Sequence, residues 1–215
     1  GGGKFVGVGY EEDRIVYSTD GITWTSVTLP ITKNWNTVTY GGGKFVVLGE
    51  FVNEYLYSTD AINWTVATVP AAVNWKSIVY GDGKFVAVAA GGTQRSMYSA
   101  DGINWTLTTP PTEAWISLAY GGGMYVAISL DYKTIMNSSD GINWAPIAGF
   151  NATRINRSVV YGNGEFVIFS RNSTTYSQST DGITWVEKFY GPNVEFGEDV
   201  VASTYANGKY VAVCE

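Results

Sequence analysis

Apolar residues gather in short runs along the chain, and similar runs return about every forty residues. One run follows a glycine-rich segment and is apolar at nearly every position, as in 44–48 (Lys-Phe-Val-Val-Leu). Such a run predicts a strand that is buried on both faces. A second run precedes it and places small and hydroxyl residues among apolar ones, as in 75–80 (Trp-Lys-Ser-Ile-Val-Tyr). We expect this second run to be the innermost strand of each repeat.

A turn segment returns five times with almost the same residues, first as 17–24 (Tyr-Ser-Thr-Asp-Gly-Ile-Thr-Trp). Serine and aspartate can hydrogen-bond the backbone of a tight turn, and glycine accepts a positive φ, so each copy predicts a turn between two antiparallel strands. The turn aspartates lie 40, 41, 39 and 41 residues apart, at Asp20, Asp60, Asp101, Asp140 and Asp181. A period this regular indicates a repeat architecture.

This turn resembles the Asp-box, or BNR repeat, of sialidase-like β-propellers, and the whole repeat is similar to those of phage tail-fibre and bacterial surface propellers. In this chain Asp and Gly are adjacent, whereas the usual box has one residue between them, and Ala61 takes the place of glycine in the second copy. The resemblance implies a propeller. It does not imply sialidase activity, because many proteins that are not enzymes carry the box.

The order of the runs within one repeat predicts an inner strand, a glycine-rich turn, an apolar second strand, a variable loop, a third strand, the box turn and an outer strand. We therefore expect an all-β fold, a β-propeller of four-stranded antiparallel blades, in one domain over residues 1–215. Five blades are the simplest count, and six are the alternative. The expected blades cover 4–29 (closed by 200–213), 35–69, 75–109, 115–148 and 156–190.

Each box ends on a tryptophan, and a large ring at the same place in every repeat suits a repeating core better than a binding face. We expect these rings to be wedges between successive blades and the box aspartates to be turn-forming residues. The five tryptophans are Trp24, Trp64, Trp105, Trp144 and Trp185.

Alternate turns of such a blade lie on opposite faces. The glycine-rich turns and the box turns share one face and are nearly constant, whereas the second-to-third loops and the segments that link the blades share the other, here called the variable face. Functional loops on a rigid scaffold differ in this way, so we expect the ligand on the variable face. The competing interpretation is that these loops have simply drifted.

Three tryptophans open the inner strands on the variable face, at Trp35, Trp75 and Trp115, and the later repeats do not keep them. We expect these rings to be exposed at a rim where they could stack on sugars; the alternative is that they cap the central channel. Further candidates for ligand binding on the same face are Arg14, Arg95, Arg171, Tyr55 and Tyr132.

Composition narrows the function classes. The net charge of −6, with 13 Lys and Arg, argues against nucleic acid as the partner. The chain has no histidine, which removes Ser-His-Asp and Cys-His catalysis and the commonest zinc ligand. The single cysteine, Cys214, excludes an internal disulfide, and no apolar run approaches the length of a membrane span. We expect no cofactor and no metal.

The leading hypothesis is a non-enzymatic binding propeller that recognises glycans or another cell-surface receptor. The resemblance to phage and surface propellers implies an extracellular or virion-associated protein. One alternative is a sialidase-type glycoside hydrolase, although the spacing of the loop carboxylates selects no catalytic pair. The other is a structural domain that assembles with other chains of a larger particle.

Overall fold

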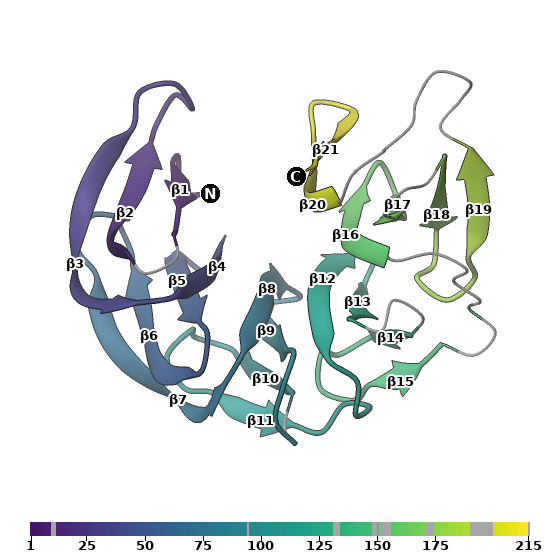
Figure 1. The fold of residues 1–215 in the computed structure, drawn as a ribbon, viewed down its shortest axis with the longest axis horizontal. Coiled ribbons are helices and arrows are strands. Elements are labelled where there is room, and N and C mark those ends of the chain that lie inside the picture. The colour runs from purple at the N-terminus through teal and green to yellow at the C-terminus, as the bar shows by residue number, and fades with distance from the viewer. Residues whose placement is uncertain are drawn as a thin grey trace. The chain divides into compact units, whose positions relative to one another are not determined.

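The computed structural model describes residues 1–9, 12–93, 95–130, 134–147, 150, 156–170, 174–189 and 200–214. All regular structure in these ranges is β-strand, and the strands form six antiparallel sheets (Figure 1). The chain divides into two compact units, Gly1–Thr108 and Thr109–Glu215, which are described one at a time. Within the described ranges, no helix has the length and hydropathy needed to cross a membrane.

The first unit holds three sheets. The first sheet contains β1 (Phe5–Gly7), β2 (Glu12–Ser18) and β3 (Thr25–Lys33). The second contains β4 (Trp35–Gly41), β5 (Lys44–Gly49), β6 (Val52–Ser58) and β7 (Thr65–Val73). The third contains β8 (Trp75–Gly81), β9 (Lys84–Ala89), β10 (Ser96–Ser99) and β11 (Thr106–Thr108).

The second unit also holds three sheets. The fourth sheet contains β12 (Trp115–Gly121), β13 (Met124–Ser129), β14 (Ile135–Ser138) and β15 (Ala145–Pro146). The fifth contains β16 (Asn156–Gly162), β17 (Glu165–Ser170), β18 (Thr175–Ser179) and β19 (Val186–Phe189). The sixth contains only β20 (Val200–Ala206) and β21 (Lys209–Cys214).

The predicted strand order is confirmed in the four complete sheets, where inner, second, third and outer strands pair as neighbours. The described strands thus make one three-stranded, four four-stranded and one two-stranded sheet, and this leaves the count of five or six blades open. The closure of the first repeat by residues 200–213 and the single domain over 1–215 stay predictions.

Two outer strands, β3 and β7, are longer than predicted. Residues 70–74 were expected to be a linking loop, yet β7 continues through Pro70 to Val73, and β3 continues through Pro30 to Lys33 in the same way. An outer strand has a free edge, so a proline there removes no ladder hydrogen bond. Only one residue then separates each of these strands from the next inner strand.

The core lies between neighbouring sheets, as the apolar second strands predicted. In β5, Phe45, Val46, Val47 and Leu48 are all buried. Residues of the second and third sheets share one buried cluster, which includes Leu48 and Phe85. Neighbouring sheets of a unit thus bury apolar side chains against one another, which is the physical reason that repeats of this kind are stable only when they stack.

Glycines before the glycine-rich turns let the next sheet approach closely. A β-carbon on Gly41 would lie 1.9 Å from the ring of Tyr80, so only a glycine leaves room for that ring. The same pairing, with 2.0–2.4 Å as the closest approach, joins Gly1 to Tyr40, Gly121 to Tyr161 and Gly162 to Tyr205. The glycine–tyrosine pair therefore sets the spacing between successive inner strands inside each unit.

Every inner strand carries an irregularity near its start. The register with the second strand shifts between Trp35 and Thr37, and between Trp75 and Ser77, so one extra residue bulges from the ladder. A β-bulge re-aims the side chain it carries. The residues at this position are Asn36, Lys76, Ile116, Arg157 and Val201.

Candidate functional site

The five box turns are closed networks of hydrogen bonds. In the first copy, Ser18 Oγ donates to Asp20 Oδ1 at 2.8 Å, and the backbone N–H groups of Ile22 and Thr23 donate to the same oxygen at 2.8 and 2.7 Å. The Gly21 N–H donates to Ser18 Oγ at 2.9 Å. The other four copies repeat these contacts. The box carboxylates are thus occupied in holding their own turns.

These hydrogen bonds also fix the ionisation of the box. Backbone N–H donors, chiefly those of Ile22 and Thr23, hold the pKa of Asp20 well below its ordinary 3.8. The same cause lowers the pKa of Asp181 to about 2, with Thr184 and Ile183 as the main donors. A carboxyl that is such a weak base is poorly suited to general acid–base catalysis near neutral pH.

Acid is therefore expected to destabilise the protein through the box turns. Since the folded-state pKa values lie below the unfolded ones, the carboxylates contribute stability above about pH 4 and lose it as the pH falls towards about 2. The free energy of unfolding, measured by urea denaturation between pH 7 and pH 2.5, should fall across that window. An Asp60→Asn variant should show a shallower fall, and a midpoint that does not change with pH would contradict the prediction.

Three of the five box tryptophans lie at the seams between neighbouring sheets. Trp105 of the third sheet packs edge-on against Tyr55 of the second, with ring centroids 6.0 Å apart. Trp64 packs against a cluster that includes Ile15 of the first sheet and Leu56 of the second. Trp185 packs against the cluster shared by the fourth and fifth sheets. Trp24 belongs to the first sheet and is 47% exposed.

The three tryptophans that were expected to be exposed at a rim are buried, so that expectation is wrong. Trp35 is 2% exposed, and Trp75 and Trp115 are 0% exposed. The indole N–H of Trp115 donates to the carbonyl of Pro111 at 3.0 Å, and that of Trp75 to the carbonyl of Ala71 at 3.3 Å. Rings so enclosed have no free face for a sugar.

Tyr55 is also buried, although it was expected among the loop candidates. Its side chain points into the seam between the second and third sheets, where the hydroxyl donates to the carbonyls of Gly102 and Ile103 at 3.0 and 3.3 Å. Burial raises the pKa of Tyr55. The residue therefore ties the third strand of one sheet to the box turn of the next.

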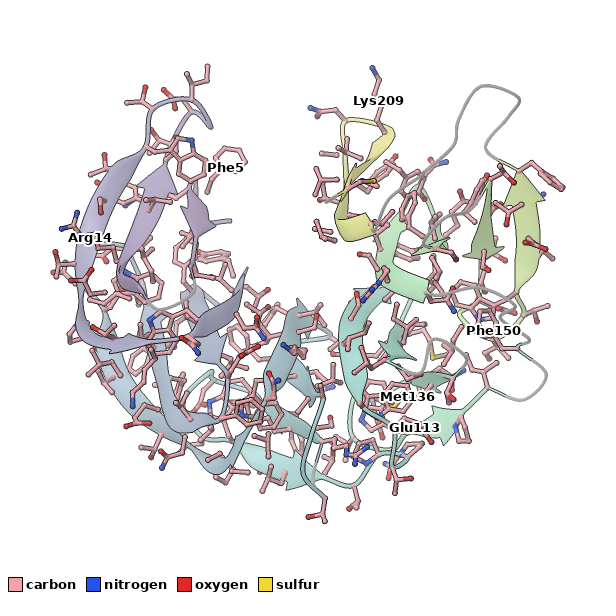
Figure 2. The ribbon with its side chains drawn as sticks, in the orientation of Figure 1. Phe5, Arg14, Glu113, Met136, Phe150 and Lys209 are labelled. Atoms are coloured by element: carbon pink, nitrogen blue, oxygen red, sulfur yellow. The ribbon has the colours of Figure 1, made fainter. Side chains whose placement is uncertain are left out.

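The predicted arginines and the last tyrosine do not gather into one site. Arg14 is exposed, projects outward from β2 (Figure 2), and lies 3.5 Å from the carboxylate of its neighbour Asp13. Arg95 donates to the carbonyl of Gly92 at 2.6 Å. Arg171 and Tyr132 lie outside the described residues. Arg14 and Arg95 thus each contact residues close to them in the chain.

A different group of residues gathers on the variable face, over the seam between the second and third sheets. Lys76, on the bulge of β8, reaches Glu50 in the neighbouring loop at 2.5 Å, and both side chains are largely covered. Asn36, on the bulge of β4, donates to the carbonyl of Trp75 at 2.9 Å. Phe51 follows Glu50 and is 70% exposed. We call Asn36, Glu50, Phe51 and Lys76 the Phe51 surface.

Phe51 is held in an unusual backbone conformation. Its φ is +53°, and its N–H donates to the carbonyl of Val73 at 3.1 Å. The other described non-glycine residues with positive φ are Ala61, Asp82, Asn163 and Asn207, all of them small or of the types that tolerate it. A bulky ring kept at positive φ and in solvent is a strained feature, and such features concentrate at functional sites. The sequence carried no signal for it beyond an aromatic residue in a variable loop.

One tyrosine–carboxylate pair invites comparison with hydrolase chemistry. The hydroxyl of Tyr210 donates to the carbonyl of Gly162 at 2.6 Å. The same hydroxyl lies 3.4 Å from the carboxylate of Glu165, to which Gln178 also donates. Burial and then the charge of Glu165 raise the pKa of Tyr210 far above its ordinary value. A phenol made this hard to ionise is a poor nucleophile. Among the described residues, no group of three or more Cys, Asp and Glu could hold a metal ion.

No family model matches the chain, and no curated protein matches it. The fold of the chain is, however, similar to that of several solved structures. A streptogramin B lyase structure superposes with a TM-score of 0.78 at 11% identity, over 94% of this chain and 70% of that one. YCF48 bound to D1 peptide gives 0.70 at 18% identity, over 95% and 70%. The nidogen/laminin complex gives 0.62 at 11% identity, over 83% and 72%.

These neighbours are β-propellers, and with the repeated antiparallel sheets they identify the fold of this chain as a repeat-blade β-propeller. Identities this low show the fold alone. None of these comparisons bears on whether the box turn is of the sialidase-like kind. The resemblance to the Asp-box family therefore stays an interpretation of the turn sequence.

Proposed function

We propose that this chain is a non-enzymatic binding propeller that recognises a glycan or another cell-surface receptor through its variable face. The observation that carries the proposal is the Phe51 surface, where an exposed aromatic ring at a strained backbone position follows, in the chain, the glutamate of a largely covered ion pair. We further propose that the protein carries a variant Asp-box and acts outside the cell or on a virion, as the repeat sequence suggested.

The composition of the surface supports binding rather than catalysis. Binding hot spots are commonly a large side chain ringed by polar contacts that exclude water. Near Phe51, its chain neighbour Glu50 pairs with Lys76 across the boundary between the second and third sheets, and Lys33 pairs with Glu54 at 3.4 Å across the boundary between the first and second sheets. Because these charges are already paired, they would orient a partner more than they would react with it.

Similar folds in complexes are consistent with this use. One of the similar structures is YCF48 bound to a D1 peptide, and another is a nidogen/laminin complex, so this kind of scaffold can present a binding surface. A streptogramin B lyase shares the fold as well. No described group of residues favours a lyase or a sialidase-type hydrolase, and neither activity is proposed.

Changing Phe51 is the direct test. The labelled chain should give signals on a glycan array or an array of extracellular proteins, and Phe51→Ser should weaken the strongest signal about tenfold or more, as removal of a hot-spot aromatic does. The melting temperature should not fall, because the ring is exposed. Ile22→Ser, which removes a side chain that is 84% exposed on the opposite face, should bind normally.

Two outcomes would contradict the proposal. If Phe51→Ser and Lys76→Ala both left binding unchanged, the site assignment would be wrong. If a parallel hydrolysis assay showed turnover of an array glycan, and replacing a single loop carboxylate abolished that turnover, the protein would be an enzyme and the non-enzymatic function would be wrong.

A further inference from the structure

The link that carries Phe51 is short. β5 ends at Gly49 and β6 begins at Val52, so only Glu50 and Phe51 lie between the two strands. Links of two residues between antiparallel strands need positive φ, and glycine, asparagine or aspartate normally supplies it. Here the φ of +53° belongs to a phenylalanine, for which this conformation is strained. A strained residue persists only when its surroundings hold it, so the contacts of this link decide where the ring lies.

Residues distant in the chain hold the link in place. The N–H of Glu50 donates to the carbonyl of Asn34 at 3.0 Å. The N–H of Phe51 donates to the carbonyl of Val73 at 3.1 Å. The side chain of Glu50 pairs with Lys76, with 2.5 Å between Oε1 and Nζ. Of these contacts, the ion pair is the one made by a side chain of the third sheet, because Lys76 lies on β8. It is therefore the contact that a substitution can remove.

The repeat itself does not require this ion pair. In the third sheet Ala90 takes the place of Glu50, since its N–H donates to the carbonyl of Asn74 at 2.9 Å in the same way. An alanine cannot form an ion pair, yet the third sheet keeps the same strand order. Lys76 lies on the bulge of β8, and a bulge re-aims the side chain it carries. The ion pair thus belongs to the Phe51 link rather than to the fold.

We propose that Lys76 is a positioning residue that controls the Phe51 surface, and that its ion pair with Glu50 keeps Phe51 at positive φ with the ring exposed. The proposal rests on the proposed function, because it concerns the same surface. The side chain of Glu50 is only 15% exposed. Without Lys76 its carboxylate would stay largely covered and lack a cation, which is costly, so the side chain turns towards water. Phe51, the next residue, then relaxes to negative φ, and its ring leaves the position that a partner contacts.

Glycine and alanine at position 51 measure the strain without a partner. In the original chain, Phe51→Gly should melt about 1–3 °C higher than Phe51→Ala, because glycine accepts positive φ and alanine does not. In a Lys76→Met background, which keeps the aliphatic stem and removes the charge, the order should reverse. A relaxed link favours alanine, since glycine has more conformational entropy to lose on folding. Lys84→Met, which removes the ion pair with Asp82 in the glycine-rich turn of the same sheet, should leave the original order.

A fluorine label shows directly whether the ring moves. A para-fluorophenylalanine at position 51 should give one fluorine NMR signal, and Lys76→Met should shift and narrow that signal because a released ring moves faster. Lys76→Arg keeps the charge and should leave the signal where it is. On the glycan and protein arrays, the signal that depends on Phe51 should fall about tenfold in Lys76→Met and be kept in Lys76→Arg.

The proposal would be overturned if glycine remained the better residue at position 51 in the Lys76→Met background, or if the fluorine signal were unchanged there. Equal changes in Lys84→Met would overturn it as well, because they would reflect general stability. So would an array signal that Phe51→Ser abolishes and Lys76→Met leaves unchanged. The melting and fluorine measurements use no partner. If both come out as expected while no array signal depends on Phe51, the proposed function fails and the positioning of Phe51 by Lys76 stands.

Discussion

Replacing Trp75 by alanine is expected to lower the free energy of unfolding by about 3–5 kcal/mol, the usual cost of removing a large aromatic side chain from a core. The ring is 0% exposed and lies in the cluster shared by the second and third sheets. The change leaves a cavity there and removes the hydrogen bond from the indole N–H to the carbonyl of Ala71. Since whole domains are stable by about 5–15 kcal/mol, the variant should be close to unfolded at moderate temperature.

Urea denaturation followed by circular dichroism measures this effect, and Trp24→Ala is its matched control. Trp24 is the same side chain at 47% exposure, so its removal should cost less than about 2 kcal/mol. If Trp75→Ala cost less than about 1 kcal/mol while it abolished ligand binding, the indole would be a binding platform after all, and the burial argument would fail.

A methyl group added at Gly41 is expected to destabilise the protein by about 1–3 kcal/mol or more, because overpacking forces a ring or a strand to move. The new β-carbon would lie 1.9 Å from the Tyr80 ring, which also packs against Phe85 at a centroid distance of 4.8 Å. Thermal unfolding of Gly41→Ala measures the loss. Gly91→Ala should be nearly neutral, since nothing lies within 4 Å of its β-carbon and its φ is not positive.

The clash at Gly41 also predicts a coupling. Tyr80→Ala alone removes a half-buried ring and is destabilising, but combined with Gly41→Ala it removes the clash as well. The double variant should therefore lose less stability than the two single losses added together, by about 1 kcal/mol or more. Strict additivity would show that the strands separate to admit the methyl group and that Tyr80 does not set their spacing.

The repeated turns and the apolar second strands could be predicted with little help from the fold. The box turn needs only Ser, Asp and a residue that accepts positive φ, all within four positions, and its hydrogen bonds are local. Alternation and apolar runs likewise report strand burial directly, as in Phe45 to Leu48. The strand order within each complete sheet followed from the same pattern.

The candidate site could not be predicted in this way. Trp75 and Tyr55 stand near variable loops in the sequence, and aromatic residues there suggested an exposed rim. The structure instead buries both, with hydrogen-bond acceptors supplied by the neighbouring sheet: Gly102 of the third sheet for Tyr55, and Ala71 on the extended β7 of the second sheet for Trp75. Phe51 shows the reverse case, where a ring with no distinguishing pattern is the exposed one.

The amino-acid sequence by itself determined the forty-residue period, the strands, the turns and the antiparallel order within a sheet, since each depends on contacts between residues close together along the chain. Only the tertiary structure determined which aromatic rings are buried, that Lys76 pairs with Glu50, and that position 41 has no room for a side chain. Those outcomes depend on contacts between one sheet and the next, and the spacing and bulges that create them are set by packing rather than by local pattern.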